Sequence, residues 1–301
     1  MVKIVVSDNM RLTHEQEKRL KALGDVKIYS EAAKSDKESL KRFNEAEIIC
    51  TEKNQIENIL YELKDKFISF PFVGMGWLNI ENLKKNGIKV SNVPGCNRMP
   101  VTEWILMMMI MLSRQLYPTI NNPSKEYAGF PKETQGLTFK RVTILGHGNV
   151  GKKIGEMCEQ LGMEVTYFRR NDDLQKNVEN ADYIVNCLDR NKDTEGMLDK
   201  KFFESLKEAY FISITDQQIY DVNAMKEALN RGNLLGAALD PAGVKPGDSS
   251  DLLYADLSSN PKVLITPHLA FNTDAAIQVG NEIMIDNVEA FLKGKQQNII
   301  L

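Results

Sequence analysis

The sequence feature that most constrains the fold is a glycine-rich segment that follows a short apolar run and precedes a segment with helical periodicity. Residues 141–145 read Arg-Val-Thr-Ile-Leu, residues 146–151 read Gly-His-Gly-Asn-Val-Gly, and residues 152–161 carry a helical pattern. Three spaced glycines alone are weak evidence. Directly after a strand and at the start of a helix, this spacing is typical of the phosphate loop of a dinucleotide-binding βαβ unit.

Each residue of this loop has an expected role. Gly146 makes the tight turn, Gly148 lets the backbone approach a pyrophosphate, and Gly151 lets the helix lie close to the strand. Asn149 and Val150 begin the helix, whose free N–H groups and positive dipole end favour bound phosphate. We therefore predict that these five residues bind a cofactor; the alternative is a plain glycine-rich turn.

The end of the next strand indicates which dinucleotide binds. An NAD site typically places an acidic residue there, about 20 residues past the glycines, to hold the ribose 2′-hydroxyl. Here the strand at 165–168 is followed by Arg169 and Arg170, which suit a 2′-phosphate. We expect NADP(H) to be preferred. NAD(H) remains possible if a bent loop returns Asp172 or Asp173, and a solvated basic turn is the other alternative.

Short β-branched runs alternate with helical runs through the rest of the chain, which predicts an α/β protein with parallel sheets. A length of 301 residues suggests two domains. Strands are expected at residues 3–7, 26–29, 47–50, 67–73 and 89–90, and then at 141–145, 165–168, 183–186, 210–214, 235–239 and 263–266. Helices are expected at residues 15–23, 37–44, 56–64, 99–116, 152–161 and 274–292, with a loop at 117–135.

Composition excludes several classes of function. The formal net charge of −3 argues against a nucleic-acid or membrane-surface binder, because both need a basic excess. The four cysteines lack metal-binding spacing, so we expect reduced thiols in a cytoplasmic protein and no metal site. The apolar run at 104–112 is about half of the roughly 20 residues needed to span a bilayer. A small-molecule substrate is the expected partner.

Further motifs occur in a fixed order around the phosphate loop. They are Val73-Gly-Met-Gly76, Asn92-Val-Pro-Gly-Cys-Asn97, Val101-Thr-Glu103, Gly236-Ala-Ala-Leu-Asp240 and Thr266-Pro-His268. With these motifs, nearly the whole chain resembles the D-2-hydroxyacid dehydrogenase family. The resemblance implies a Rossmann-type dinucleotide-binding domain, residues 96–284, inserted into a flavodoxin-like substrate domain of residues 1–95 and 285–301. It also implies a homodimer formed through the nucleotide-binding domain.

The same resemblance implies roles for individual residues. His268 would protonate the substrate carbonyl as hydride arrives. Asp240 would help to position the nicotinamide end, and Leu188 would line the adenine pocket. The remaining matches are substrate-binding positions, namely Gly74, Met75, Gly76 and Asn97.

Two catalytic positions of the family are changed. The family reads Ile-Asn-x-x-Arg-Gly where this chain has Asp216 in place of the arginine, and a carboxylate there would repel a 2-oxo acid. Lys245 stands at the position of the glutamate that pairs with the histidine, where a cation would disfavour the protonated imidazole. Asp248 replaces the lost carboxylate if the loop slips by three residues, and a mutual Asp216–Lys245 pair would relieve the cost of both charges.

Three interpretations remain open. The first is a divergent NADPH-dependent reductase in which His268, Lys245 and Asp216 form an altered catalytic set. The second is an ordinary 2-hydroxyacid dehydrogenase whose missing groups come from elsewhere, with Arg98 and Arg190 as candidates. The third is a catalytically inactive dinucleotide-binding sensor or interaction protein, because function depends on the site and not on the fold.

Overall fold

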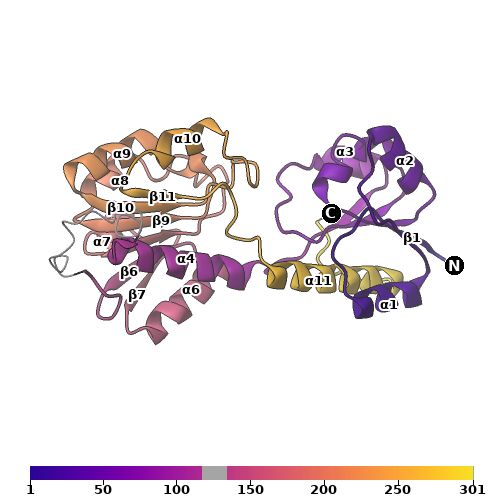
Figure 1. The fold of residues 1–301 in the computed structure, drawn as a ribbon, viewed down its shortest axis with the longest axis horizontal. Helices are drawn as coiled ribbons and strands as arrows, with labels where there is room; N and C mark the ends of the chain where they lie inside the picture. Colours follow the sequence, from indigo (N-terminus) through magenta and orange to yellow (C-terminus); the bar gives the residue numbers. More distant parts are fainter. Residues whose placement is uncertain (117–133, 301) are drawn as a thin grey trace, which may run out of the picture. The chain divides into compact units, whose positions relative to one another are not determined.

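The structure, a computed structural model, describes residues 1–116 and 134–300. The chain divides into two compact units (Figure 1): unit 1 comprises Met1–Asn97 and Asn272–Leu301, and unit 2 comprises Arg98–Phe271. The second division lies at residue 272, whereas we expected it at 285. The reason is that α11 (Asp274–Leu292) is one uninterrupted helix whose buried side chains pack within unit 1.

Unit 1 is a five-stranded parallel sheet in the order β2-β1-β3-β4-β5, which is the flavodoxin-like order. Helices α1 and α11 pack side by side on one face, and α2 and α3 pack on the other. The strands are β1 (Lys3–Val6), β2 (Asp25–Ile28), β3 (Ile48–Cys50), β4 (Phe67–Ser69) and β5 (Lys89–Ser91). The other helices of the unit are α1 (His14–Leu23), α2 (Asp36–Asn44) and α3 (Ile80–Lys85).

Helix α11 belongs to unit 1 through both apolar and polar contacts. Phe291 stacks on Phe67 with ring centroids 4.1 Å apart. Asn281 and Asn287 are buried, and each side-chain amide donates to a backbone carbonyl of the first segment, at Met10 and Asn92. Buried amides need such partners, so these bonds specify where the helix lies on the sheet.

Unit 2 is a six-stranded parallel sheet in the order β11-β10-β9-β8-β6-β7. Counted from β6, this is a doubly wound order of 2-1-3-4-5-6, whose topological switch point lies between β6 and β8. The strands are β6 (Arg141–Leu145), β7 (Glu164–Phe168), β8 (Tyr183–Asn186), β9 (Ala209–Ser213), β10 (Leu234–Leu239) and β11 (Val263–Ile265). In such sheets, ligands bind outside the carboxyl ends of the strands at the switch point.

Two layers of helices cover this second sheet. On one face lie α4 (Arg98–Ser113) and α6 (Asn149–Gln160); on the other lie α7 (Leu174–Val178), α8 (Lys200–Ser205), α9 (Val222–Arg231) and α10 (Leu252–Ser258). Among the described residues, no helix is long and apolar enough to cross a membrane.

The helix expected at 56–64 is wrong. The structure has two short 3₁₀ helices there, η1 (Lys53–Gln55) and η2 (Leu60–Glu62). The apolar residues that suggested the helix are buried at helical spacing, but most backbone hydrogen bonds here join residues three apart, as from the Ile59 N–H to the Ile56 carbonyl. The strand expected at 67–73 ends at Ser69. Most of the loop expected at 117–135 lies outside the described residues.

Candidate active site

The phosphate loop, residues 146–151, directly follows β6 and lies at the carboxyl edge of the unit 2 sheet. Gly146 has φ +100°, and a Cβ there would lie 2.7 Å from the Cys187 carbonyl oxygen. A Cβ on Gly151 would overlap the carbonyl oxygen of Gly146. In contrast, a Cβ on Gly148 would meet nothing within 4 Å. The fold therefore requires glycine at positions 146 and 151. At Gly148 the fold would tolerate a Cβ, so the protein itself does not explain the glycine there, and the space is accessible to a ligand.

Gly148 is also the N-cap of α6, and it has no side chain with which to cap the first turn. The first backbone bond of the helix runs from the Lys152 N–H to the Gly148 carbonyl. Asn149 and Val150 therefore begin a helix whose N–H groups remain available at the switch point. This is the arrangement by which a helix N-terminus binds phosphate.

Leu188, expected in the adenine pocket, lies against the same loop. Its backbone nitrogen would be 3.2 Å from a Cβ on Gly146 and donates to Asn186 Oδ1 at 3.2 Å. The side chain is half-buried and packs on the core between the sheet and α7–α9.

The two arginines after β7 are exposed. The loop that carries them bends back, because Asp172 Oδ2 accepts from the Arg169 N–H at 2.8 Å. Asp173 instead caps α7, accepting from the Lys176 N–H. Arg170 forms an exposed ion pair with Asp193 at 3.0 Å.

His268 stands after β11 in a strained backbone conformation. Its φ is +54°, which is uncommon for any residue other than glycine and persists only where the surroundings impose it. Asp240, at the end of β10, imposes it here. This carboxylate is 2 % exposed and accepts from Thr266 Oγ1 at 2.5 Å, from the Leu269 N–H at 2.7 Å and from the Ala270 N–H at 2.9 Å. The segment around His268 is thus fastened on both sides to Asp240.

The ring of His268 has a defined orientation. Its Nδ1 lies 3.1 Å from the carbonyl oxygen of Val244, and the His268 and Phe271 rings pack edge-to-face. A carbonyl oxygen only accepts, so Nδ1 carries a proton and Nε2 is the ring atom free to exchange one. A backbone carbonyl next to Lys245 therefore takes the place expected for the family's glutamate.

Asp216 pairs with a different cation from the one considered in the sequence. Its Oδ2 lies 3.3 Å from Nη1 of Arg190, which comes from the loop after β8, and its Oδ1 accepts from the Gln218 N–H at 2.9 Å. The suggested Asp216–Lys245 pair is absent among the described residues. Arg190 was an alternative candidate in the sequence, but nothing there linked it to Asp216.

Lys245 lies in an exposed turn and does not join this group. The turn is closed by a bond from the Asp248 N–H to the Lys245 carbonyl. Hydrogen bonds from Ser250 lower the pKa of Asp248, and the Lys245 charge lowers it further. The Val244 carbonyl, and not Asp248, is the hydrogen-bond partner of His268 Nδ1.

A buried polar network beneath Asp216 was missed in the sequence. The Asn186 amide donates to Ser213 Oγ at 3.2 Å and to Thr215 Oγ1 at 2.8 Å. The two hydroxyls lie 3.1 Å apart. The only signal in the sequence was that these polar residues stand at or just past the ends of two apolar strands.

The expected substrate-binding residues lie in unit 1. Gly74 and Gly76 are exposed, and a Cβ on either would meet nothing within 4 Å. The backbone carbonyl of Met75 closes a turn by accepting a hydrogen bond from the Leu78 N–H. Asn97 is the last residue of the first segment of unit 1. The turn leaves backbone groups accessible to a ligand.

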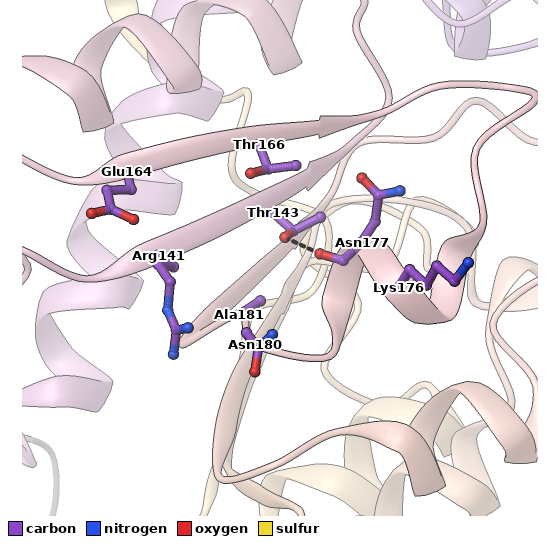
Figure 2. Close-up of a pocket in the computed structure, with 8 residues that line it drawn as sticks. All are labelled: Arg141, Thr143, Glu164, Thr166, Lys176, Asn177, Asn180 and Ala181. Atoms are coloured by element: carbon purple, nitrogen blue, oxygen red, sulfur yellow. Dashed lines mark hydrogen bonds between the residues drawn. The ribbon is translucent and has the colours of Figure 1, made fainter.

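A groove of about 300 Å³ lies elsewhere on unit 2 (Figure 2). It is formed by the amino-terminal halves of β6 and β7 together with α7 and the turn that follows it. Figure 2 shows the bond from Thr143 Oγ1 to the Asn177 carbonyl, at 2.8 Å, which joins the strand to the helix. Because it lies away from the carboxyl edge, this groove is not the dinucleotide site.

Within the described part of the chain, no group of three or more His, Cys, Asp or Glu side chains is placed to hold a metal ion. The four cysteines are free thiols. Burial raises the pKa of Cys50, Cys158 and Cys187 to about 12, which keeps them protonated and unreactive.

Comparison with known proteins identifies the family. Residues 106–270, more than half of the chain, match the D-isomer specific 2-hydroxyacid dehydrogenase NAD-binding domain. The chain therefore belongs to this family of NAD-dependent oxidoreductases. A glycerate dehydrogenase from Methylorubrum extorquens is 29% identical over 286 residues, which cover 90% of each protein.

Two solved structures share the fold over all or nearly all of both chains. An acyclic imino acid reductase in complex with NADPH and D-Arg has a TM-score of 0.80 at 21% identity, covering 100% of both chains. A D-lactate dehydrogenase with NAD⁺ from Lactobacillus jensenii has a TM-score of 0.79 at 22% identity, covering 100% of this chain and 99% of the other.

The three bonds to Asp240 predict a specific loss on mutation. In Asp240→Asn, one carboxylate oxygen becomes an NH₂ group, so at least one buried donor of the 266–270 segment loses its acceptor. We expect the free energy of unfolding of unit 2 to fall by about 1–3 kcal/mol, measured by urea denaturation followed by tryptophan fluorescence in a Trp77→Phe background, in which Trp104 is the remaining tryptophan. The matched control is Asp172→Asn, which removes charge from an exposed carboxylate with one backbone bond and should cost less than about 1 kcal/mol. Equal stability of wild type and Asp240→Asn would contradict this role of Asp240.

Proposed function

We propose that this protein is a reductase of the D-2-hydroxyacid dehydrogenase type that uses NADPH in preference to NADH and reduces the carbonyl group of a 2-oxo compound, with His268 as proton donor. One observation carries the proposal: the Asp240 carboxylate holds His268 in a strained conformation, with Nδ1 tied to the Val244 carbonyl. Strained residues cluster at functional sites, and His268 stands at the same carboxyl edge of the sheet as the dinucleotide loop, with three strands between β11 and β6.

The residues present fit a dinucleotide. The space at Gly148 and the N–H groups that begin α6 suit a pyrophosphate, and Leu188 lies beside them. When bound, the nicotinamide supplies or accepts a hydride. His268 Nε2 holds the proton that the carbonyl oxygen receives, and it takes the proton back in the reverse direction. The Val244 carbonyl keeps the imidazole in this orientation throughout, because Nδ1 keeps its proton.

Support for NADPH comes from the charges after β7. Arg169 and Arg170 are exposed at the strand end, and among the described residues the Arg169 guanidinium has no hydrogen-bond partner. Asp172 and Asp173, the two carboxylates that would favour NADH, are engaged by the backbone N–H groups of the turn and of α7. A 2′-phosphate placed here would receive charge-assisted hydrogen bonds.

If the arginines bind the 2′-phosphate, replacing both with alanine will weaken NADPH binding much more than NADH binding. We expect the Kd for NADPH to rise about 10- to 100-fold, as for the loss of a hydrogen bond to a charged group, and the Kd for NADH to change less than about 3-fold. Fluorescence titration measures both constants. The control is Arg141→Ala, which changes an exposed arginine at the amino end of β6, away from the carboxyl edge. Equal losses for the two cofactors would refute the preference.

An inactive dinucleotide-binding sensor is the second candidate function. It is favoured by the replacement of the family's arginine and glutamate with Asp216 and Lys245. Turnover decides between the two functions. We expect NADPH oxidation with at least one member of a panel of 2-oxo acids, aldehydes and ketones; tight NADPH binding without turnover on the whole panel would favour the sensor.

His268→Gln tests the proton donor. Glutamine retains a polar side chain but does not exchange a proton, so we expect kcat to fall at least about 100-fold while the Kd for NADPH stays within about 2-fold. Steady-state kinetics and fluorescence titration give the two values. His14→Gln, at the start of α1, is the control. If the His268 variant retained full turnover, another group would have to supply the proton.

The homodimer implied by the family stays a prediction. Helix α4 of unit 2 exposes Met99, Met107 and Ile110 at intervals of eight and three residues. A second copy of the chain that packed on this helix would remove these apolar side chains from water.

A further inference from the structure

The geometry points to Arg190, held in place by Asp216, as the residue that binds the carboxylate of the substrate. This inference rests on the proposed function and narrows it to 2-oxo acids. The family's arginine is missing from its own position, and a guanidinium reaches that position from the neighbouring strand.

The order of the strands brings the pair into the site. Arg190 follows β8 and Asp216 follows β9, and these two strands are adjacent and parallel. His268 follows β11, two strands beyond β9, on the same carboxyl edge. Arg190 reaches toward that side, since its Nη1 lies 3.3 Å from Asp216 Oδ2. Arg169 and Arg170 follow β7, at the opposite end of the sheet.

Asp216 is the fixed member of the pair. Its carboxylate is anchored by the Gln218 N–H at 2.9 Å and its side chain is 18% exposed. The preceding residue, Thr215, is held by the buried Asn186 amide. A carboxylate held in this way orients the guanidinium that binds it. Asp216 is therefore a positioning residue and does not itself meet the substrate.

Arg190 keeps most of its binding capacity. The side chain is 44% exposed, and within the described residues its guanidinium makes this single hydrogen bond out of five possible N–H donors. The free edge suits a bidentate bond to a planar carboxylate, which is the recognition that arginine performs better than lysine. The ion pair also offsets the repulsion that Asp216 alone would exert on an anionic substrate.

The two other candidate cations, Lys245 and Arg98, lack such an arrangement. Lys245 lies in an exposed turn beside Asp248, whose pKa its charge helps to lower. Arg98 is exposed at the start of α4, and within the described part of the chain it has no ion-pair partner that would orient it. Arg190 is thus the cation that unit 2 places and orients at the position of the missing arginine.

The test compares substrates with and without a carboxylate. We expect Arg190→Ala to raise KM for the preferred 2-oxo acid about 10- to 100-fold. The Kd for NADPH and the kcat/KM for the methyl ester of the same acid should stay within about 2-fold. Arg190→Lys should recover part of the loss. Arg231→Ala, an exposed arginine at the end of α9, is the control and should behave as wild type.

Asp216→Asn tests the positioning role. It should raise KM for the 2-oxo acid severalfold in the wild-type background and have no further effect in the Arg190→Ala background, because the two residues act as one unit. An equal loss of kcat/KM for the acid and the ester in Arg190→Ala would overturn the inference, since Arg190 would then have only a structural role. An unchanged KM for the acid would overturn it as well.

A binding measurement separates this inference from the proposed function. Oxamate, an unreactive analogue of a 2-oxo acid, is titrated by calorimetry into the wild-type and Arg190→Ala proteins saturated with NADPH. Binding to the wild type that weakens about 10- to 100-fold in the variant supports the carboxylate site even if no panel compound is turned over. Equal binding to both proteins, or binding to neither, would contradict it.

Discussion

The carboxylate of Asp240 is the constraint on which the candidate site depends. A buried charge is tolerated only when hydrogen bonds replace its hydration, and here Thr266, Leu269 and Ala270 provide them. The same three bonds fasten the segment that contains His268 and impose its left-handed backbone. The neighbouring loop is tied to this segment at two further points, through the Val244 carbonyl and through the bond from the Gly247 N–H to the Pro267 carbonyl.

Around Asp240, two groups of the site come from other positions than in the family pattern, namely the partner of His268 Nδ1 and the guanidinium. The partner of His268 Nδ1 is a neutral backbone carbonyl in place of a carboxylate, and the guanidinium near Asp216 comes from the loop after β8 in place of the loop after β9. A parallel sheet makes such exchanges simple, because the carboxyl ends of adjacent strands lie about 4.8 Å apart and a long side chain spans that distance. The buried network of Asn186, Ser213 and Thr215 joins the two strands at this point.

The sequence predicted what depends on local patterns. The phosphate loop follows from glycine spacing, and the structure shows the close approaches that explain Gly146 and Gly151. The doubly wound sheets follow from the alternation of apolar runs. The turns at 53–62 escaped prediction because the buried residues Ile56, Ile59, Leu60 and Leu63 have helical spacing in the sequence, although short 3₁₀ turns with about three residues per turn and the loop between them carry these residues in the structure. The pairing of Arg190 with Asp216 spans 26 residues of sequence, and the Val244 carbonyl leaves no trace in residue identity because every residue has one.

The most direct test of the proposed mechanism is to measure which ring nitrogen of His268 carries the proton. The mechanism requires that Nδ1 carries it and that Nε2 is free to exchange a proton with the substrate. The chain has three histidines, so a long-range ¹H–¹⁵N correlation spectrum of the ¹⁵N-labelled protein, assigned with the His268→Gln variant, resolves the ring. In the neutral imidazole we expect the proton on Nδ1, bonded to the Val244 carbonyl, and an unprotonated Nε2. A proton on Nε2 would show that Nδ1 cannot donate to Val244, and it would contradict the assignment of His268 Nε2 as the atom that exchanges a proton with the substrate.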